Sequence, residues 1–226
     1  MLYLIGLGLD RDLSKKALEY IEKCAELYLD VYTSELNIKL DRPVIKAGRE
    51  LLESDSLVKK AKDMNIGILV VGDVFIATTH YSLYLEALKQ KVEVKIAHGT
   101  SILNYISELG LFQYKFGAIA SITFDEKVSS YMDIIKKNLA NGWHTLCLLD
   151  LKDGRFMDVN NAVTNLLKKG LDENQLVIAY SYNNKSNAII GSAKDLKNKK
   201  LDKHLYCLII PGVLHFMEEE ALELWK

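Results

Sequence analysis

The sequence has few cysteines, no long apolar run and almost no net charge, and each shortage excludes a class of protein. Its three cysteines lie far apart inside apolar segments, so they form neither a disulfide framework nor Cys-x-x-Cys metal spacing. No apolar run reaches the roughly 18 residues of a membrane-spanning helix, and the first residues lack the basic segment of a signal peptide. The net charge of −1 provides no basic field for nucleic acid or an acidic membrane. These absences predict a reduced, cytoplasmic protein that uses neither nucleic acid nor membrane.

The composition is that of an ordinary globular protein, and the first half of the chain alternates short apolar segments with helical patterns. Of the 226 residues, 49% are hydrophobic and 26% charged, enough for one large or two small domains. The pattern predicts strands at 2–5, 27–32, 68–71 and 92–97, with helices after Ser14 and at 56–64, 80–91 and 101–109. Such alternation is typical of a parallel α/β sheet.

The periodicity is interrupted from Gly110 to Gly117 and then resumes with a different rhythm. This predicts a first α/β domain over residues 1–110, a linker over 111–117 and a second α/β domain over 118–226. In the second domain the pattern predicts strands at 118–124, 145–151, 176–180 and 206–210, with 188–192 as a further candidate, and helices at 131–140, 158–169 and 217–225. The basic segment 194–200 is predicted to be a solvated surface loop, or alternatively a docking site for an acidic partner.

The stretch from Ile66 to His80 combines a buried strand, a Gly72-Asp73 turn and a helix start. In open α/β sheets, ligands bind at the carboxyl ends of the strands, where such a turn exposes backbone N–H groups and a carboxylate. The same residues also suit an ordinary connection, with Gly72 as the turn and Asp73 as a cap. The stretch alone leaves both interpretations open.

Other chemical motifs are incomplete. The Gly6-x-Gly8 pair follows a strand, but Arg11 replaces the third glycine of the dinucleotide motif, and the residues 31–33 that end the predicted second strand are not acidic. The pair therefore predicts a tight turn that admits a ligand close to the backbone. The five histidines lack zinc spacing, and no Gly-x-Ser-x-Gly elbow occurs. We therefore predict no metal site.

Six short motifs follow one another in order: LYLIGLGL at 2–9, VYTS at 31–34, GDxxxATTH at 72–80, HGTSI at 98–102, YKFG at 114–117 and HTLCLLDLK at 144–152. In this combination the chain closely resembles the diphthine synthases, methyltransferases of diphthamide biosynthesis within the tetrapyrrole-methylase-like class that uses S-adenosylmethionine. The resemblance covers most of the chain. One departure is Val74, because the family has Gly-Asp-Pro where this loop lacks the fixed φ of proline. The segment from Asn183 to Ser186 is also less similar.

The resemblance implies a two-domain fold with S-adenosylmethionine in the cleft between the domains, and a homodimer. It also implies which residues bind the donor. From the first domain these are Leu9, Asp73, Ile76, Ser101 and Ile102, and from the second they are Leu151, Ser181 and Tyr206. The apolar side chains of this set are expected to contact the adenine of the donor, and its carboxylate and hydroxyls the polar parts.

By resemblance, the reaction transfers methyl groups to the amine of a 3-carboxy-3-aminopropyl histidine on translation elongation factor 2, giving a trimethylammonium product and S-adenosylhomocysteine. An α-amino group titrates at about 7.7–8.0, so a neutral fraction exists at cell pH and no catalytic acid or base is assigned. His80 and His98 are the motif residues able to act as a base near neutrality, although each also suits a helix start or turn. The alternatives are a corrinoid or porphyrin-precursor methylase and a noncatalytic nucleotide-binding protein.

Overall fold

A computed structural model describes residues 1–10, 13–32, 41–152, 155–183, 185–201 and 205–226. The chain divides into two compact units, Met1–Asn104 and Tyr105–Lys226. This division comes before the predicted linker at 111–117, which packs within the second unit. Its Phe112 N–H donates to Glu218 at 2.7 Å, and Gly117 N–H donates to the His144 carbonyl at 2.9 Å.

The first unit is a five-stranded parallel sheet in the order β3-β2-β4-β1-β5. Its strands are β1 (Leu2–Gly6), β2 (Glu26–Asp30), β3 (Ile45–Ala47), β4 (Ile66–Val70) and β5 (Val94–Ala97). All residues of the central strand β4 are buried, as the apolar run predicted. Because the strands are parallel, their carboxyl ends lie at one edge of the sheet.

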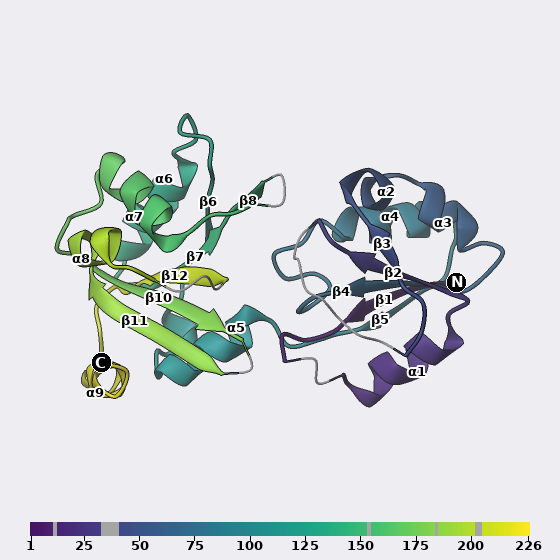
Figure 1. Ribbon diagram of the computed structural model, residues 1–226, viewed down its shortest axis with the longest axis horizontal. Coiled ribbons are helices and arrows are strands. Elements are labelled where there is room, and N and C mark those ends of the chain that lie inside the picture. Colours follow the sequence, from purple (N-terminus) through teal and green to yellow (C-terminus); the bar gives the residue numbers. More distant parts are fainter. Residues whose placement is uncertain (11–12, 33–40, 153–154, 184, 202–204) are drawn as a thin grey trace. The chain divides into compact units, whose positions relative to one another are not determined.

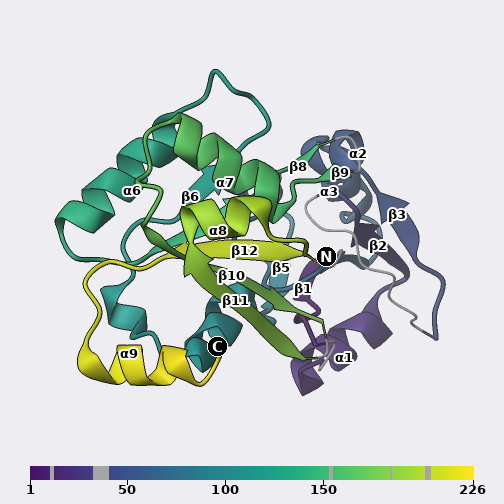
Figure 2. The same ribbon diagram turned by 60° about the vertical axis from the view of Figure 1, so that its left-hand side comes forward.

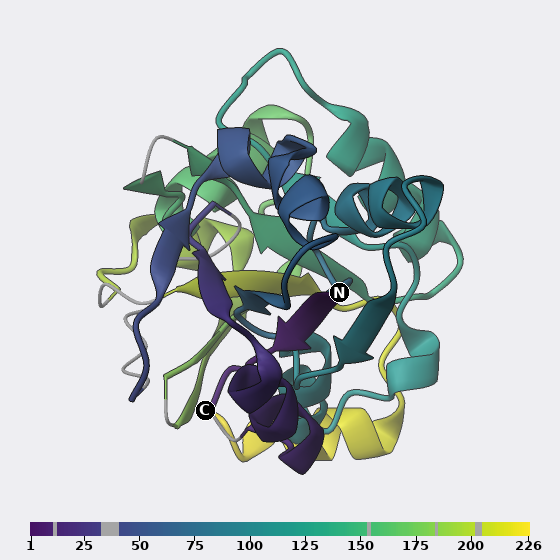
Figure 3. The same ribbon diagram turned by 90° about the vertical axis from the view of Figure 1, so that its right-hand side faces the viewer.

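Helices cover both faces of this sheet. The purple helix α1 (Lys15–Lys23) packs on one face, with Ser14 as its N-cap, and the other face carries α2 (Arg49–Glu53), α3 (Ser56–Lys60) and α4 (Tyr81–Lys89) (Figures 1 and 3). Alternate strand residues divide between two cores: Leu4 and Ile68 pack with α2–α4, whereas Ile5 and Leu69 pack with α1. The predicted parallel α/β sheet is therefore confirmed.

The second unit contains a mixed sheet in the order β11-β10-β12-β7-β6, in which only the β6–β7 pair is parallel. The strands are β6 (Ala120–Ile122), β7 (Thr145–Leu149), β10 (Leu176–Tyr182), β11 (Ser186–Ser192) and β12 (Tyr206–Ile210), and a separate ribbon joins β8 (Leu151–Lys152) to β9 (Arg155–Phe156). One face carries α6 (Ser130–Ala140), α7 (Val159–Lys168) and α8 (Ala193–Asn198), and the other carries α9 (Phe216–Glu223) (Figure 2). The short helix α5 (Ile102–Tyr105) crosses the division between the units and continues into the 3₁₀ turn η1 (Ile106–Leu109), and a second 3₁₀ turn, η2, spans Gln113–Lys115.

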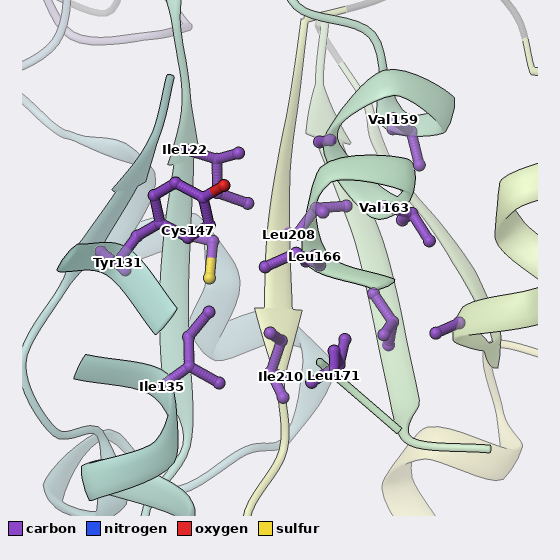
Figure 4. Packing of buried hydrophobic residues seen from close by; sticks show 14 of the residues in the cluster. Ile122, Tyr131, Ile135, Cys147, Val159, Val163, Leu166, Leu171, Leu208 and Ile210 are labelled. Carbon is purple, nitrogen blue, oxygen red and sulfur yellow. The ribbon is translucent and has the colours of Figure 1, made fainter. Parts of the chain in front are cut away.

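The larger core of the second unit lies between the sheet and helices α6 to α8. Ile122, Cys147, Leu208 and Ile210 from the strands meet Tyr131 and other apolar side chains of the helices (Figure 4). All three cysteines of the chain are buried and free, and burial raises the pKa of the Cys147 thiol. The predicted reduced core cysteines are confirmed.

Helix α9 is anchored by the buried carboxylate of Glu218. This group accepts hydrogen bonds from Phe112 N–H at 2.7 Å, His215 N–H at 2.9 Å and His144 Nε2 at 3.0 Å, and it pairs with the Lys115 ammonium. Burial alone raises the pKa of Glu218, but these donors outweigh it and hold the pKa at about 2.

Three local predictions differ from the structure. The segment 194–200 is not a loop, because α8 occupies Ala193–Asn198 and begins with a capping box between Ser192 and Asp195. That capping signal outweighs the run of lysines. Strand β3 and helix α2 were not predicted, since each is short and lacks a full period of its pattern. The predicted strand at 145–151 is interrupted after Leu149.

Candidate functional site

Three loops meet at the carboxyl edge of the first unit's sheet, following β1, β4 and β5. Gly8 and Gly72 exchange two backbone hydrogen bonds of 3.2 Å, and both have left-handed φ angles, of 71° and 78°. A Cβ atom on Gly99 would lie 2.4 Å from the Gly72 carbonyl oxygen. The loops therefore pack backbone against backbone, which only glycine permits, and this explains the Gly6-x-Gly8 pattern.

Asp73 joins the β4 loop to the β5 loop. Its Oδ1 accepts the Phe75 N–H at 3.0 Å, and its Oδ2 accepts the Gly99 N–H at 3.3 Å and lies 2.7 Å from His98 Nδ1. The carboxylate is buried, and the side chain of Val74, where the family has proline, is fully buried in the core. These bonds and this packing hold the loop in place without proline.

A second aspartate and histidine lie close together at the neighbouring strand β2, although neither ring nitrogen of His80 forms a hydrogen bond within the described residues. Asp30 Oδ1 accepts the Tyr32 N–H at 2.6 Å, and Oδ2 lies 3.3 Å from Nε2 of His80, the residue before α4. Both side chains are buried. The expectation that no acidic residue ends the second strand was wrong, because β2 ends at Asp30. This carboxylate contacts the Tyr32 N–H and lies beside His80.

The five residues predicted to bind the donor in the first unit all lie in these edge loops. A Cβ atom built on Gly72 would contact Leu9 at 3.7 Å and Ser101 at 3.9 Å, which places those two residues beside the same glycine. Ser101 is buried, and its Oγ accepts the Leu103 N–H at 3.2 Å, as predicted for the start of a helix. Ile76 and Ile102 are half-buried, as is Leu9.

In the second unit the structure brings two of the three predicted residues together. Ser181 and Tyr206 lie directly opposite each other on β10 and β12, Ser181 buried and Tyr206 half-buried. Leu151 is half-buried on the separate ribbon, opposite Phe156. Residues 33 and 34 of the VYTS motif and His204 lie outside the described residues.

The edge of the first unit's sheet combines apolar side chains, a carboxylate and backbone N–H groups, as the resemblance predicts for a donor site. Half-buried apolar side chains (Leu9, Ile76 and Ile102) suit the adenine, while Asp73 and the loop N–H groups suit the polar parts. Sequence reasoning did not identify Asp30 as a member of these loops. The position of Asp30 at the end of a strand could have identified it. The predicted strand ended two residues too late, so Asp30 was placed inside the strand.

The comparisons with known proteins match most or nearly all of the chain. The family model of the tetrapyrrole (corrin/porphyrin) methylases matches residues 1–184. A diphthine synthase of Methanococcus maripaludis is 37% identical over 249 residues, covering 99% of this chain and 98% of the relative. The chain belongs to the diphthine synthases of the tetrapyrrole methylase family.

Further relatives support this membership. A probable diphthine methyl ester synthase of Arabidopsis thaliana is 32% identical over 272 residues, covering 100% of this chain and 98% of the relative. A crystal structure of a diphthine synthase superimposes with a TM-score of 0.92 at 30% identity, covering 99% of this chain and 95% of the other. The chain is accordingly a methyltransferase that depends on S-adenosylmethionine, as the resemblance predicted.

Two features are absent from the described part of the chain. No helix there is long and apolar enough to cross a membrane. The same residues contain no group of three or more His, Cys, Asp or Glu side chains arranged to hold a metal ion.

Proposed function

We propose that this chain methylates the amino group of a 3-carboxy-3-aminopropyl histidine on translation elongation factor 2, in the cytoplasm, up to the trimethylammonium form called diphthine. The observation that carries the proposal is the match to diphthine synthases over 99% of this chain and 98% of the relative's length. Because the similarity spans both units, it favours the same acceptor substrate as in the relatives. Similarity confined to one unit would indicate only a common donor-binding domain.

We propose that the donor is held by all eight predicted residues, in a cleft to which both units contribute. Support comes from the loops after β1, β4 and β5, which present Leu9, Asp73, Ile76, Ser101 and Ile102 at one edge, and from the facing positions of Ser181 and Tyr206. Asp73 would hold the polar part of the donor, and the half-buried apolar residues would cover its adenine.

Methyl transfer mainly requires that the amine, the methyl carbon and the sulfur are aligned. The donor supplies a methyl group on a cationic sulfur, and the acceptor amine is a nucleophile when neutral. The interlocked glycine loops and the Asp73 contacts hold this backbone in place. A donor bound beside it would have its methyl group and sulfur fixed for in-line attack by the amine. Exclusion of water by half-buried apolar side chains favours the discharge of a cation in the transition state.

A second candidate adds an ester methyl group, which the name of the Arabidopsis relative indicates for that protein. A corrinoid or porphyrin-precursor methylase is less well supported, because the relatives named here that match the chain over its full length are diphthine synthases.

We also propose a homodimer, supported by an exposed apolar surface on the second unit at the start of α9. Its members are Tyr114, Trp143, Val213, Phe216 and Met217, with exposed fractions of 45–82%. Beside this surface, the Phe112 ring stacks on Tyr114. Apolar surfaces of this kind mark protein interfaces. Sedimentation should show a dimer that Phe216→Lys dissociates, whereas Leu88→Lys on α4 leaves it intact.

The function is tested by mass spectrometry of elongation factor 2 that carries the carboxy-aminopropyl histidine, after incubation with this protein and S-adenosylmethionine. A gain of three methyl groups that resists mild alkali supports the N-methyltransferase. A fourth, alkali-labile methyl group would support the ester activity. A factor that gains no methyl group would refute both.

A further inference from the structure

His98 is the accessible member of the carboxylate–histidine pairs at the sheet edge. Its side chain is 67% exposed, whereas that of Asp73, 2.7 Å away, is 6% exposed. In the other pair, His80 and Asp30 are 2% and 1% exposed. Within the part of the chain that the structure describes, Nε2 of His98 forms no hydrogen bond. The ring therefore has one nitrogen beside Asp73 and leaves the other free to take up a proton.

Asp73 determines which nitrogen of His98 carries the hydrogen. An ionised carboxylate only accepts hydrogen bonds, and Asp73 is fixed by the N–H groups of Phe75 and Gly99 at 3.0 and 3.3 Å. Neutral His98 must therefore donate from Nδ1, which leaves the lone pair on Nε2. This is the arrangement by which a carboxylate orients a histidine base. The Phe75 ring lies edge-on to the imidazole, with centroids 6.4 Å apart and an interplanar angle of 66°.

We propose that Asp73 and His98 form a catalytic dyad, in which His98 Nε2 is the general base that deprotonates the acceptor ammonium. The proposal rests on the proposed function and adds a residue role to it. His98 opens the HGTSI loop, three residues before Ser101 and four before Ile102. A base at this place therefore lies in the loop that is proposed to hold the donor.

Trimethylation requires a proton to leave before every transfer. At pH 7 an α-amino group with a pKa of about 7.7–8.0 is only about one-tenth neutral. His98 Nε2 takes the proton from the ammonium, the freed lone pair of nitrogen forms the bond to the methyl carbon, and the carbon–sulfur bond breaks with its electrons remaining on sulfur. The imidazolium then releases its proton to water. The first two transfers each regenerate an N–H ammonium, so the base acts again.

The decisive variant is His98→Asn. The asparagine amide nitrogen takes the place of Nδ1 and still donates to Asp73, but nothing replaces Nε2. We expect donor affinity, measured by calorimetry, to stay within twofold of the native chain. The methylation rate at pH 7 should fall by roughly a hundredfold or more, the usual contribution of a general base. The loss should shrink above pH 9, where the amine is neutral without help, and added imidazole should restore part of the rate of His98→Ala.

The matched control is His215→Asn, which exchanges one exposed N-cap residue for another far along the chain and should leave the rate unchanged. A His98→Asn rate within about threefold of native at pH 7 would refute the base. If the native chain transferred no methyl group to the factor, the proposed function would be refuted. That result differs from one in which the native chain is active and His98→Asn is equally active, which would refute only the base.

A readout that needs neither donor nor acceptor tests the dyad directly. Long-range ¹H–¹⁵N NMR of labelled protein distinguishes the two neutral histidine tautomers. We expect His98 to carry its hydrogen on Nδ1, and Asp73→Asn to abolish that preference. Diethyl pyrocarbonate should also modify His98 well before the buried His80 and His144. A hydrogen on Nε2 in the native chain would overturn the proposal.

Discussion

Asp30 and Asp73 each accept a backbone N–H from two residues ahead with one oxygen, and the other oxygen lies near a histidine from a later segment. Each aspartate thereby holds the start of its own loop and brings that loop next to a second segment. Because both follow adjacent strands of a parallel sheet, the pairs connect four segments at one edge. Single side chains, rather than extended secondary structure, order the site.

The first prediction concerns Asp73→Ala. If Asp73 hydrogen-bonds the donor, its loss should lower donor affinity by roughly ten- to a hundredfold, because a charge-assisted hydrogen bond contributes about 1.5–3 kcal/mol. Calorimetric titration with S-adenosylmethionine measures the change. Asp125→Ala is the matched control, since Asp125 also accepts the N–H two residues ahead, at 2.9 Å, but in an exposed loop of the second unit. An unchanged dissociation constant in folded Asp73→Ala would leave Asp73 only the role of orienting His98 and the loops.

Residue-level chemistry was only partly predictable. The Gly72-Asp73 turn is local, so the sequence revealed it as a candidate ligand site. Its partner His98 lies 25 residues away, and the pairing depends on β5 returning beside β1. The spacing of residues along the sequence does not reveal such a contact, so His80 and His98 both remained candidates for a base. The structure distinguishes them, because His98 is exposed and His80 is buried.

At the scale of elements, α9 shows how a polar core can hold a helix. Its mean burial is low, since Phe216 and Leu224 are 67% and 86% exposed. The helix is retained by the fully buried Glu218, which collects donors from η2, from the segment before β7 and from its own N-cap. Removing one member of a buried ionic network leaves the others uncompensated.

We therefore predict that Glu218→Gln lowers the free energy of unfolding by about 3 kcal/mol, the lower end of the range for breaking a buried pair. Urea unfolding followed by the fluorescence of the two tryptophans, 143 and 225, reports on the second unit, because both belong to it. Glu219→Gln, on the exposed side of the same helix, should change stability by less than about 0.5 kcal/mol. Equal effects of the two variants would contradict the anchoring role.

His144 adds a pH dependence to the same element. Gly212 N–H donates to Nδ1 at 3.0 Å, so the ring is neutral and donates from Nε2 to Glu218. Burial lowers the pKa of His144 below its ordinary 6.5. The unfolded chain thus binds a proton more readily, and the stabilisation present above pH 6.5 is lost as the pH falls below it.

The corresponding measurement compares the native chain with His144→Gln between pH 7 and pH 5. The native free energy of unfolding should decline more steeply with acid, because only the native chain has this titrating group. His215→Gln serves as the control for removing an exposed histidine. Parallel slopes for native and His144→Gln would show that His144 does not titrate differently on folding.

Element prediction succeeded where pattern and length agreed. The strand at Tyr206–Ile210 and the helix after Asp158 were placed within a residue, since each has a clear period and a cap. The lysine-rich segment beginning at Lys194 was assigned by charge, although the Ser192–Asp195 capping box specified a helix. The glycine-bounded stretch 110–117 was predicted to be a linker, and its long-range contacts with Glu218 could not be seen in the sequence.

At the scale of the whole molecule, two units of different construction belong to one enzyme. The parallel sheet of the first unit places three loops at one edge, whereas the mixed sheet of the second brings Ser181 and Tyr206 opposite each other. Family membership extends over both units, so neither is an appendage. The eight proposed donor-binding residues are likewise divided between them, and this division can be tested without cutting the chain.

The last prediction is that Tyr206→Leu, in the second unit, weakens S-adenosylmethionine binding although Asp73 and its loops are untouched. Loss of a hydroxyl and an aromatic contact should reduce affinity by roughly tenfold, which corresponds to about 1.4 kcal/mol. Calorimetry measures it, with Leu205→Ala as the control, because Leu205 precedes Tyr206 and is 42% exposed. If Tyr206→Leu binds the donor as tightly as the native chain while Asp73→Ala does not, the donor is held by the first unit alone. Weakening by both variants, with Leu205→Ala unaffected, requires a donor that contacts both units.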